Sequence, residues 1–200
     1  DPVHKRYTLG YSLLELWRAA HRRIELKDIA RKSMEELMEK IGETVFLGVL
    51  NGDHVTILDV VESRNMMKIT APPGTRLPLL VGATGRVLLG QIGTEKAKVL
   101  LQEAGLVRYT SRSVVDPKQF LKEAMKAKES GFAIDDEEYI QGIRAVASPL
   151  GEGHAPAAIW VVGFTSTMDD PKVEMTVAEI QKAAREIRQS LRSAETQGGF

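Results

Sequence analysis

Cysteine is absent from the 200-residue chain, which excludes disulfide bonds, zinc ribbons and thiol catalysis. An apolar run long enough to cross a membrane is absent as well, and the chain does not open on a basic segment followed by an apolar one. These absences predict a soluble protein of the cytoplasm without a membrane partner. An excess of either charge is also missing, because 27 Lys and Arg residues balance 27 Asp and Glu residues. A stand-alone nucleic-acid binder would carry a strongly basic face, so contact with DNA is expected to come from elsewhere.

The residues that are present describe an ordinary globular chain, with 43% hydrophobic and 27% charged residues. Such a chain can form one core with an appendage. Apolar residues at helical spacing predict two consecutive helices, over 11–22 and over 26–41, the second ending at Gly42. The β-rich runs 44–50 and 55–63 flank an Asn-Gly turn and predict a hairpin.

Further strands and helices follow along the rest of the chain. In order, the sequence predicts a third strand at 66–70, a loop at 71–78, a buried helix at 79–90, a short helix from a Thr94 cap to Leu101, a helix from an Asp116 cap with Pro117 to Gly131, strands within 142–150 and 155–166, and a last helix from 176 to about 193. The strands fall into antiparallel pairs rather than alternating βαβ units. The predicted fold class is therefore α+β, a mostly antiparallel sheet with helices on both faces.

Residues 135–138 place four acids in a row, Asp-Asp-Glu-Glu. Successive side chains on an extended strand point to opposite faces, so at most alternate carboxylates could converge on a metal ion. Runs of charge usually lie in solvent. Three interpretations stay open: a metal site, a solvated acidic turn, or one acid that turns inward toward a ligand.

Motifs for covalent catalysis do not stand out, because the four histidines are scattered and no Ser lies in a nucleophile motif. Residues 82–85, Gly-Ala-Thr-Gly, lie at the start of the predicted buried helix. First-turn N–H groups lack partners within the helix and hold carboxylates well. Small residues at this position would equally allow tight packing of the helix on the sheet.

Four segments of the chain together resemble the IclR family of bacterial transcriptional regulators. They are YTLGYSLLEL, GETVFLGVLNGDHVTILDVVES, RLPLLVGATGRVLL and GFAIDDEEYIQGIRAVASPL. In that family a winged helix-turn-helix binds operator DNA, and a GAF-like C-terminal domain binds a small effector. The resemblance implies that residues 1–23 are the end of the wing and the linker helix, and that residues 24–200 are the GAF-like effector-binding domain. The recognition helix is missing from this sequence.

The resemblance also assigns roles to single residues. The first acid of the run, Asp135, would point into the effector pocket, while Asp136, Glu137 and Glu138 would be surface or dimer-contact residues. The implied pocket consists of Met66, Ile69 and Leu77 as an apolar wall, Ala83 and Thr84 as backbone donors to an acid, Asp135, and Ala145, Trp160 and Val162 from the last hairpin. Strand alternation agrees, because it places Ala145 on one face of its strand with Ile143 and Ala147, and Trp160 on one face with Ala158 and Val162.

Trp160 and Val162 stand where family members that sense small acids carry polar side chains. An indole offers a flat apolar surface on which a ring can stack. The effector is therefore expected to be an aromatic or otherwise apolar acid rather than a two- or three-carbon keto acid.

Three hypotheses for the function follow. The first is a ligand-sensing and oligomerisation domain, in a homodimer or homotetramer, that needs no catalysis, cofactor or metal. A small carboxylic acid would bind to it and change operator binding. The alternative is a small GAF-like enzyme that uses the acidic cluster from Asp135 to Glu138. The third is a pure dimerisation module, if Trp160 itself fills the pocket.

Overall fold

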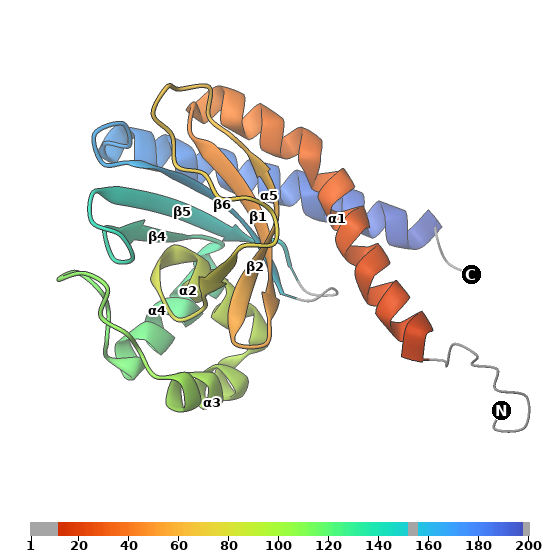
Figure 1. Cartoon of the computed structure of the whole chain (residues 1–200), viewed down its shortest axis with the longest axis horizontal. Coiled ribbons are helices and arrows are strands. Elements are labelled where there is room, and N and C mark those ends of the chain that lie inside the picture. The colour runs from red at the N-terminus through yellow and green to blue at the C-terminus, as the bar shows by residue number, and fades with distance from the viewer. Residues whose placement is uncertain (1–11, 152–155, 198–200) are drawn as a thin grey trace, which may run out of the picture.

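A computed structural model of the chain describes residues 12–151 and 156–197. In chain order its elements are α1 (Ser12–Ile41), β1 (Thr44–Asn51), β2 (His54–Val61), β3 (Arg76–Pro78), α2 (Gly82–Ile92), α3 (Thr94–Ala104), α4 (Pro117–Ser130), β4 (Ala133–Asp136), β5 (Ile143–Pro149), β6 (Ala157–Phe164) and α5 (Asp170–Gln197). Figure 1 shows the strands as one curved sheet between two layers of helices.

The six strands form a single sheet in the order β3-β2-β1-β6-β5-β4, and every neighbouring pair is antiparallel. The hairpins β1–β2 and β5–β6 supply the four central strands, because β1 pairs with β6. The predicted hairpins and the predicted α+β class with helices on both faces of an antiparallel sheet are confirmed.

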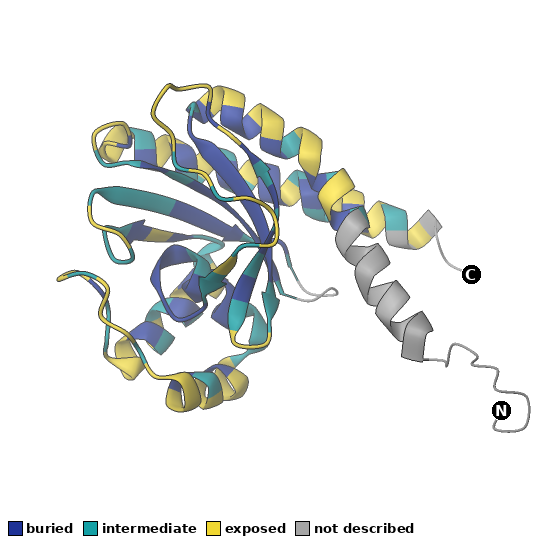
Figure 2. Cartoon of the chain, viewed as in Figure 1, coloured by how far each residue is buried: buried dark blue, intermediate teal, exposed yellow. Residues whose placement is uncertain are grey.

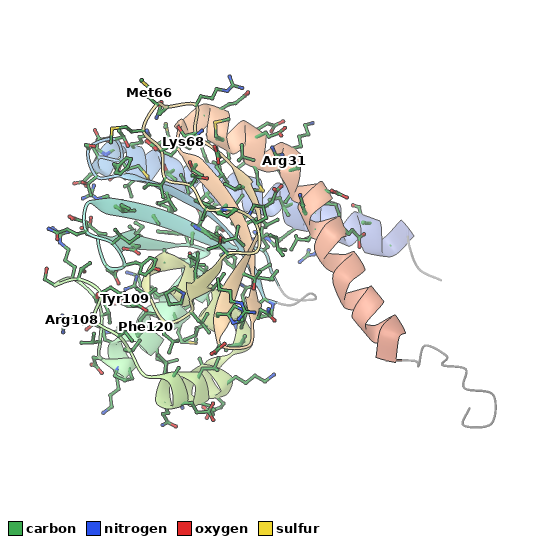
Figure 3. The ribbon with its side chains drawn as sticks, viewed as in Figure 1. Arg31, Met66, Lys68, Arg108, Tyr109 and Phe120 are labelled. Atoms are coloured by element: carbon green, nitrogen blue, oxygen red, sulfur yellow. The ribbon has the colours of Figure 1, made fainter. Side chains whose placement is uncertain are left out.

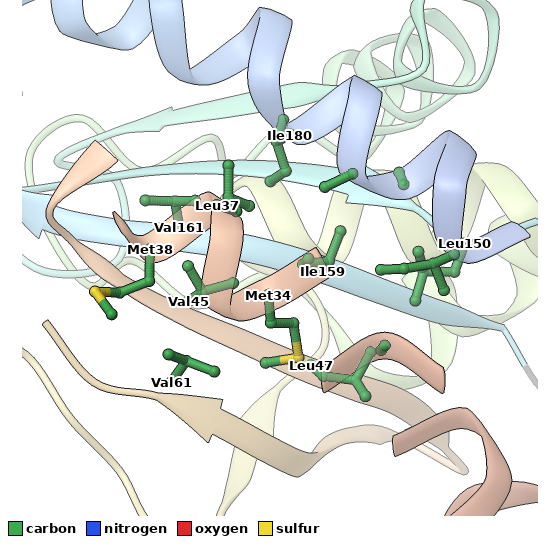
Figure 4. Close-up of a cluster of buried hydrophobic side chains, with 14 of the residues drawn as sticks. Met34, Leu37, Met38, Val45, Leu47, Val61, Leu150, Ile159, Val161 and Ile180 are labelled. Carbon is green, nitrogen blue, oxygen red and sulfur yellow. The ribbon is translucent and has the colours of Figure 1, made fainter. Parts of the chain in front are cut away.

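One face of the sheet is covered by α1 and α5 (Figure 1). Apolar residues of the helices, such as Met34 and Ile180, pack against alternate residues of the strands, such as Val45 and Ile159 (Figure 4). Burial of one such side chain stabilises the fold by roughly 1.5–3 kcal/mol. This core holds the two long helices against the sheet.

The opposite face of the sheet is covered by α2 and α4, with α3 packed outside them. Its core includes the strand residues Phe46 and Trp160 together with Leu88 of α2 and Phe120 of α4. Figure 2 shows the strands buried between the layers, while the outer faces of the helices are exposed. The strand residues of this second core also border the candidate site.

A single helix, α1, replaces the two helices expected over 11–22 and 26–41. The polar stretch from His21 to Glu25 contains no Gly or Pro that would stop a helix, so the helix continues through it. Residues 1–11 and the side chains of residues 12–24 lie outside the described part of the structure. The predicted wing end falls among them.

Several helix boundaries differ from the prediction by a few residues, and two differences have a local cause. The last helix begins at Asp170 rather than at 176, because the Asp169 carboxylate accepts the N–H of Lys172 at 3.0 Å and caps it. Thr94 begins α3 without capping it, since Gly93 occupies the cap position and the Thr94 hydroxyl lies 3.3 Å from the sulfur of Met125.

The predicted third strand at 66–70 is wrong. These residues lie in the loop after β2, and the pairing edge of β2 is taken instead by Arg76–Pro78, with Leu77 opposite Val55. The prediction for α4 is confirmed, because the Asp116 carboxylate caps its first turn and Gly131 ends it in the left-handed conformation. The cap of α4 was readable from the sequence, whereas the choice of an edge strand was not.

Candidate functional site

A cavity of about 220 Å³ lies between the sheet and the start of α2. Its walls come from all six strands, from the loop at 69–71, and from the turn after β4. Most of the lining is apolar, and the polar side chains on it belong to Thr70, Thr84, Asp135 and Tyr139. A mostly apolar cavity with a few converging polar groups is the usual form of a small-molecule site.

The floor of the cavity is aromatic. Trp160 on β6 lies directly opposite Phe46 on β1, and the two rings stack with centroids 5.5 Å apart and planes 15° apart. The indole extends over Gly48, where an added β-carbon would come within 2.8 Å of the ring. A larger residue at 48 would therefore clash with the indole and with the carbonyl oxygen of Thr56.

The first turn of α2 closes one end of the cavity with small residues, of which Ala83 and Thr84 line it. The N-cap residue, Val81, has an apolar side chain that offers no cap to the helix. First-turn N–H groups at such an end are available to an anion, and the helix dipole favours negative charge there. The helix predicted at 79–90 begins at Gly82, so the small residues 82–85 form its first turn as expected.

Asp135 projects from β4 against this helix start. Gly82 has a φ of 59°, and a β-carbon there would stand 2.1 Å from Oδ2 of Asp135, so only glycine leaves room for the carboxylate. The other oxygen, Oδ1, accepts the N–H of Glu138 at 2.7 Å. With Asp135 only 7% exposed, burial raises the pKa of its carboxyl to about 6, helped by the charge of Glu138 and opposed by its N–H and by Arg86.

The four consecutive acids do not converge. Asp136 pairs with Arg112 and with Arg144, whose Nε lies 2.6 Å from its Oδ1, and Glu137 accepts the N–H of Gly142 at 2.8 Å. Glu137 adopts a φ of 62°, which bends the chain and turns these side chains apart. Within residues 12–151 and 156–197, no group of three His, Asp or Glu side chains is placed to hold a metal ion.

The expectation that Glu138 lies at the surface of the domain is wrong. Its side chain is 13% exposed and pairs at 2.6 Å with Arg86, which is itself almost fully buried on α2. Arg86 also contacts Glu123 of α4 at 2.7 Å and donates to the carbonyl of Ile134 at 3.1 Å. The signal in the sequence that could have predicted this pairing is Arg86 itself, an arginine within the largely apolar stretch of α2.

The turn that carries Glu138 is held from outside by the loop between α3 and α4. The hydroxyls of Thr110 and Ser113 donate to the carbonyls of Glu137 and Glu138, each at 2.7 Å. Tyr109 of this loop, labelled in Figure 3, meets the ring of Tyr139 edge to face at 5.0 Å. Tyr139 lines the cavity, so this loop fixes part of its wall.

The residues expected at the pocket are mostly brought together. Eight of the nine line the cavity, namely Ile69, Leu77, Ala83, Thr84, Asp135, Ala145, Trp160 and Val162. Met66 does not, because it sits at the tip of the loop after β2 with its side chain fully exposed at 101% (Figure 3). The part of that loop that reaches the cavity is Ile69 to Ala71.

Sequence reasoning missed several lining residues. Phe46 and Ile57 could have been found by strand alternation, since they face the same side as Trp160 across the hairpin. Tyr139 and Ile140 lie in an irregular turn, where no periodic signal exists. The indole of Trp160 forms the floor and does not fill the cavity, so the condition for a module without a ligand is not met.

The family model for "Bacterial transcriptional regulator IclR C-terminal" matches residues 18–189. The chain belongs to the IclR family. Among its relatives, the HTH-type transcriptional regulator BhcR of Paracoccus denitrificans (strain Pd 1222) is 35% identical over 189 residues, 94% of this chain and 68% of that protein. The curated relatives it matches are named as transcriptional regulators and repressors, not enzymes, and the chain spans about 60–68% of the length of the first of them.

Solved IclR structures share the fold. The Thermotoga maritima IclR superposes with a TM-score of 0.79 at 28% identity, covering 94% of this chain and 76% of that one. An IclR homologue from Microbacterium hydrocarbonoxydans, crystallised in complex with 4-hydroxybenzoate, gives a TM-score of 0.77 at 27% identity over 92% of this chain and 75% of that one. The chain thus has the fold of the C-terminal domains of IclR regulators. None of the helices in its described part is long and apolar enough to cross a membrane.

Proposed function

We propose that this IclR domain senses a small carboxylic acid and passes the signal to operator DNA through a winged helix-turn-helix outside this sequence. The observation that carries the proposal is the cavity at the start of α2, where the buried Asp135 meets the helix N-terminus. The regulator acts in the cytoplasm, where bacterial DNA is, as a homodimer or homotetramer. Such a symmetric assembly would fit an operator built of paired half-sites.

The carboxylate of the ligand lies on the N–H groups of Ala83 and Thr84. These groups have no side-chain cap in front of them and carry the positive end of the helix dipole. Asp135 then accepts a hydrogen bond from a hydroxyl of the ligand or shares a proton with it. Ile69, Leu77, Ala145 and Val162 enclose the apolar part of the molecule.

The apolar part of the ligand is an aromatic ring. A cavity of about 150 Å³ is enough to hold benzene, so the 220 Å³ found here accommodates a ring together with its carboxylate. The stacked pair of Trp160 and Phe46 gives that ring a flat surface. The 4-hydroxybenzoate complex of the Microbacterium homologue supports this choice.

The enzyme alternative receives less support from the geometry. Acid/base catalysis needs two titratable groups that converge on one reacting atom. Among the acids of residues 135–138, Asp136 and Glu137 share Arg112 as a partner, but neither of them lines the cavity. The domain therefore works as a sensor, with no catalytic residue, cofactor or metal.

A thermal-shift screen of carboxylic acids tests the proposal. Benzoate and 4-hydroxybenzoate should raise the unfolding temperature, because a ligand at a hundredfold excess over its Kd stabilises the folded chain by about 2.7 kcal/mol. At about pH 5, where the Asp135 carboxyl is mostly protonated, Asp135→Ala should weaken this binding by about 1–3 kcal/mol. The control Asp28→Ala, at an exposed position on α1, should not weaken it. If no acid shifts the wild type, the sensing function is contradicted, and turnover of an acid would favour the enzyme.

A further inference from the structure

A ligand carboxylate at the start of α2 would lie beside a carboxylate that is already there. Oδ2 of Asp135 contacts Gly82, the first residue of that helix, and Ala83 and Thr84 follow it on the cavity wall. An organic anion that accepts from their N–H groups therefore comes to rest next to Oδ2. Two carboxylates this close in a largely apolar cavity cannot both stay ionised at low cost.

The charges around Asp135 do not compensate for a second anion. On α2 it faces Arg86, whose guanidinium is already shared by Glu138 of the turn and Glu123 of α4. The turn also brings the phenol of Tyr139, and the loop at 69–71 brings the neutral Thr70. Before any ligand binds, the single positive charge of Arg86 already faces the three carboxylates of Asp135, Glu138 and Glu123.

We propose that binding of an organic anion in this cavity is coupled to the uptake of one proton by Asp135. The inference rests on the proposed function and states how that site is regulated. The proton comes from solvent and is shared between Oδ2 of Asp135 and a carboxylate oxygen of the ligand. Oδ1 continues to accept the N–H of Glu138, so the only covalent change is the O–H bond formed with the proton that solvent gives up.

The coupling gives the site a defined pH dependence. Burial raises the pKa of Asp135 to about 6 in the free domain, so the carboxyl is mostly ionised above that pH and must take up a proton when the anion binds. Affinity should be constant just below about pH 6 and should fall about tenfold per pH unit above it. The regulator would then respond to the acid and to the pH together.

The charge of Glu138 influences the pH above which the affinity for the anion falls. Its negative charge raises the pKa of Asp135, and its side chain offsets the charge of Arg86. Glu138→Gln keeps the N–H that holds Oδ1 but removes the charge. The midpoint of the pH dependence should therefore move to lower pH, a direction that mere loosening of the wall does not predict.

Calorimetry of the whole chain with benzoate tests the coupling. Titrations at about pH 7.5 in buffers of different ionisation enthalpy report the number of protons taken up, which should be about one and should approach zero near pH 5. Asp135→Asn, checked for folding by thermal unfolding, should bind benzoate without proton uptake and with an affinity independent of pH. Asp28→Asn, the exposed control on α1, should behave as the wild type.

The outcomes separate the two proposals. Benzoate binding with no proton uptake at about pH 7.5, or uptake that persists in Asp135→Asn, overturns the coupling and leaves the sensing function standing. A shift of the midpoint to higher pH in Glu138→Gln also contradicts it. If the wild type binds neither benzoate nor any other acid of the screen, the sensing function fails, and the coupling fails with it.

Discussion

The carboxyl group of Asp135 lies in the wall of a cavity whose other side chains are mostly apolar. Because its pKa is about 6 in the folded chain and about 3.9 in an unfolded one, folding tightens proton binding. The resulting stabilisation is fully present below about pH 4 and is lost as the pH rises through about 6.

An asparagine at position 135 cannot ionise, so the Asp135→Asn variant should not lose stability through this titration as the pH rises. Its free energy of unfolding relative to wild type should rise by about 2–3 kcal/mol between about pH 4 and pH 7, measured by urea denaturation across that range. The same comparison for Asp28→Asn should stay flat, since Asp28 is exposed. Parallel curves for Asp135→Asn and wild type would show that the buried carboxyl is not what titrates.

Trp160 decides which ligands fit the floor of the cavity. Trp160→Ser removes the surface that stacks on Phe46 and should weaken benzoate by about 0.5–1.5 kcal/mol beyond the loss of burial, while admitting small polar acids such as pyruvate. Trp160→Phe keeps a ring and should keep the aromatic preference. Tighter binding of glyoxylate or pyruvate than of benzoate by the wild type, measured by calorimetry, would contradict the aromatic reading.

Among the elements, α2, α4 and β4 are joined by the buried guanidinium of Arg86. Glu138→Ala should therefore lower the free energy of unfolding by about 1–3 kcal/mol, the penalty for leaving a buried polar partner unpaired. Glu123→Ala should cost less, because its side chain is 33% exposed. In a double-mutant cycle, Arg86→Met with Glu138→Gln should lose less than the two single changes added together, and strict additivity would contradict the pairing.

Elements that depend on their own residues were predictable from the sequence. The cap of α4 follows from Asp116 and Pro117, and its end from Gly131. The family resemblance placed Ala145, Trp160 and Val162 at the pocket, where they lie, and strand alternation agreed because the period of a strand is fixed.

Features that depend on distant neighbours were not predictable in the same way. The 66–70 run has strand-like composition, but the edge of β2 pairs with Arg76–Pro78 instead. Met66 therefore lies at a loop tip rather than in the cavity. The inward turn of Glu138 depends on Arg86, which lies 52 residues away in the chain. The division into a linker over 1–23 and a domain over 24–200 stays a prediction.

At the scale of the whole molecule, α1 extends past the sheet toward the N-terminus (Figure 1). Its 30 residues span about 45 Å. The chain carries no net charge, and the family match covers the C-terminal part of a regulator.

The chain by itself should therefore not bind operator DNA specifically, whereas the full regulator should, in a manner that the acid changes. Gel shifts of both proteins on the same operator fragment, at the same salt concentration, make the comparison. A nanomolar, sequence-specific shift by residues 1–200 alone would contradict the assignment of DNA binding to another domain.

Fluorescence of Trp160 tests the central claim, that the cavity is where the acid binds, most directly. The sequence contains two tryptophans, so Trp17→Phe leaves Trp160 as the reporter on the cavity floor. Benzoate should change its emission saturably, with the same midpoint that calorimetry gives, and Asp135→Ala should move both midpoints together. Emission that stays constant while calorimetry records binding would place the acid elsewhere on the protein.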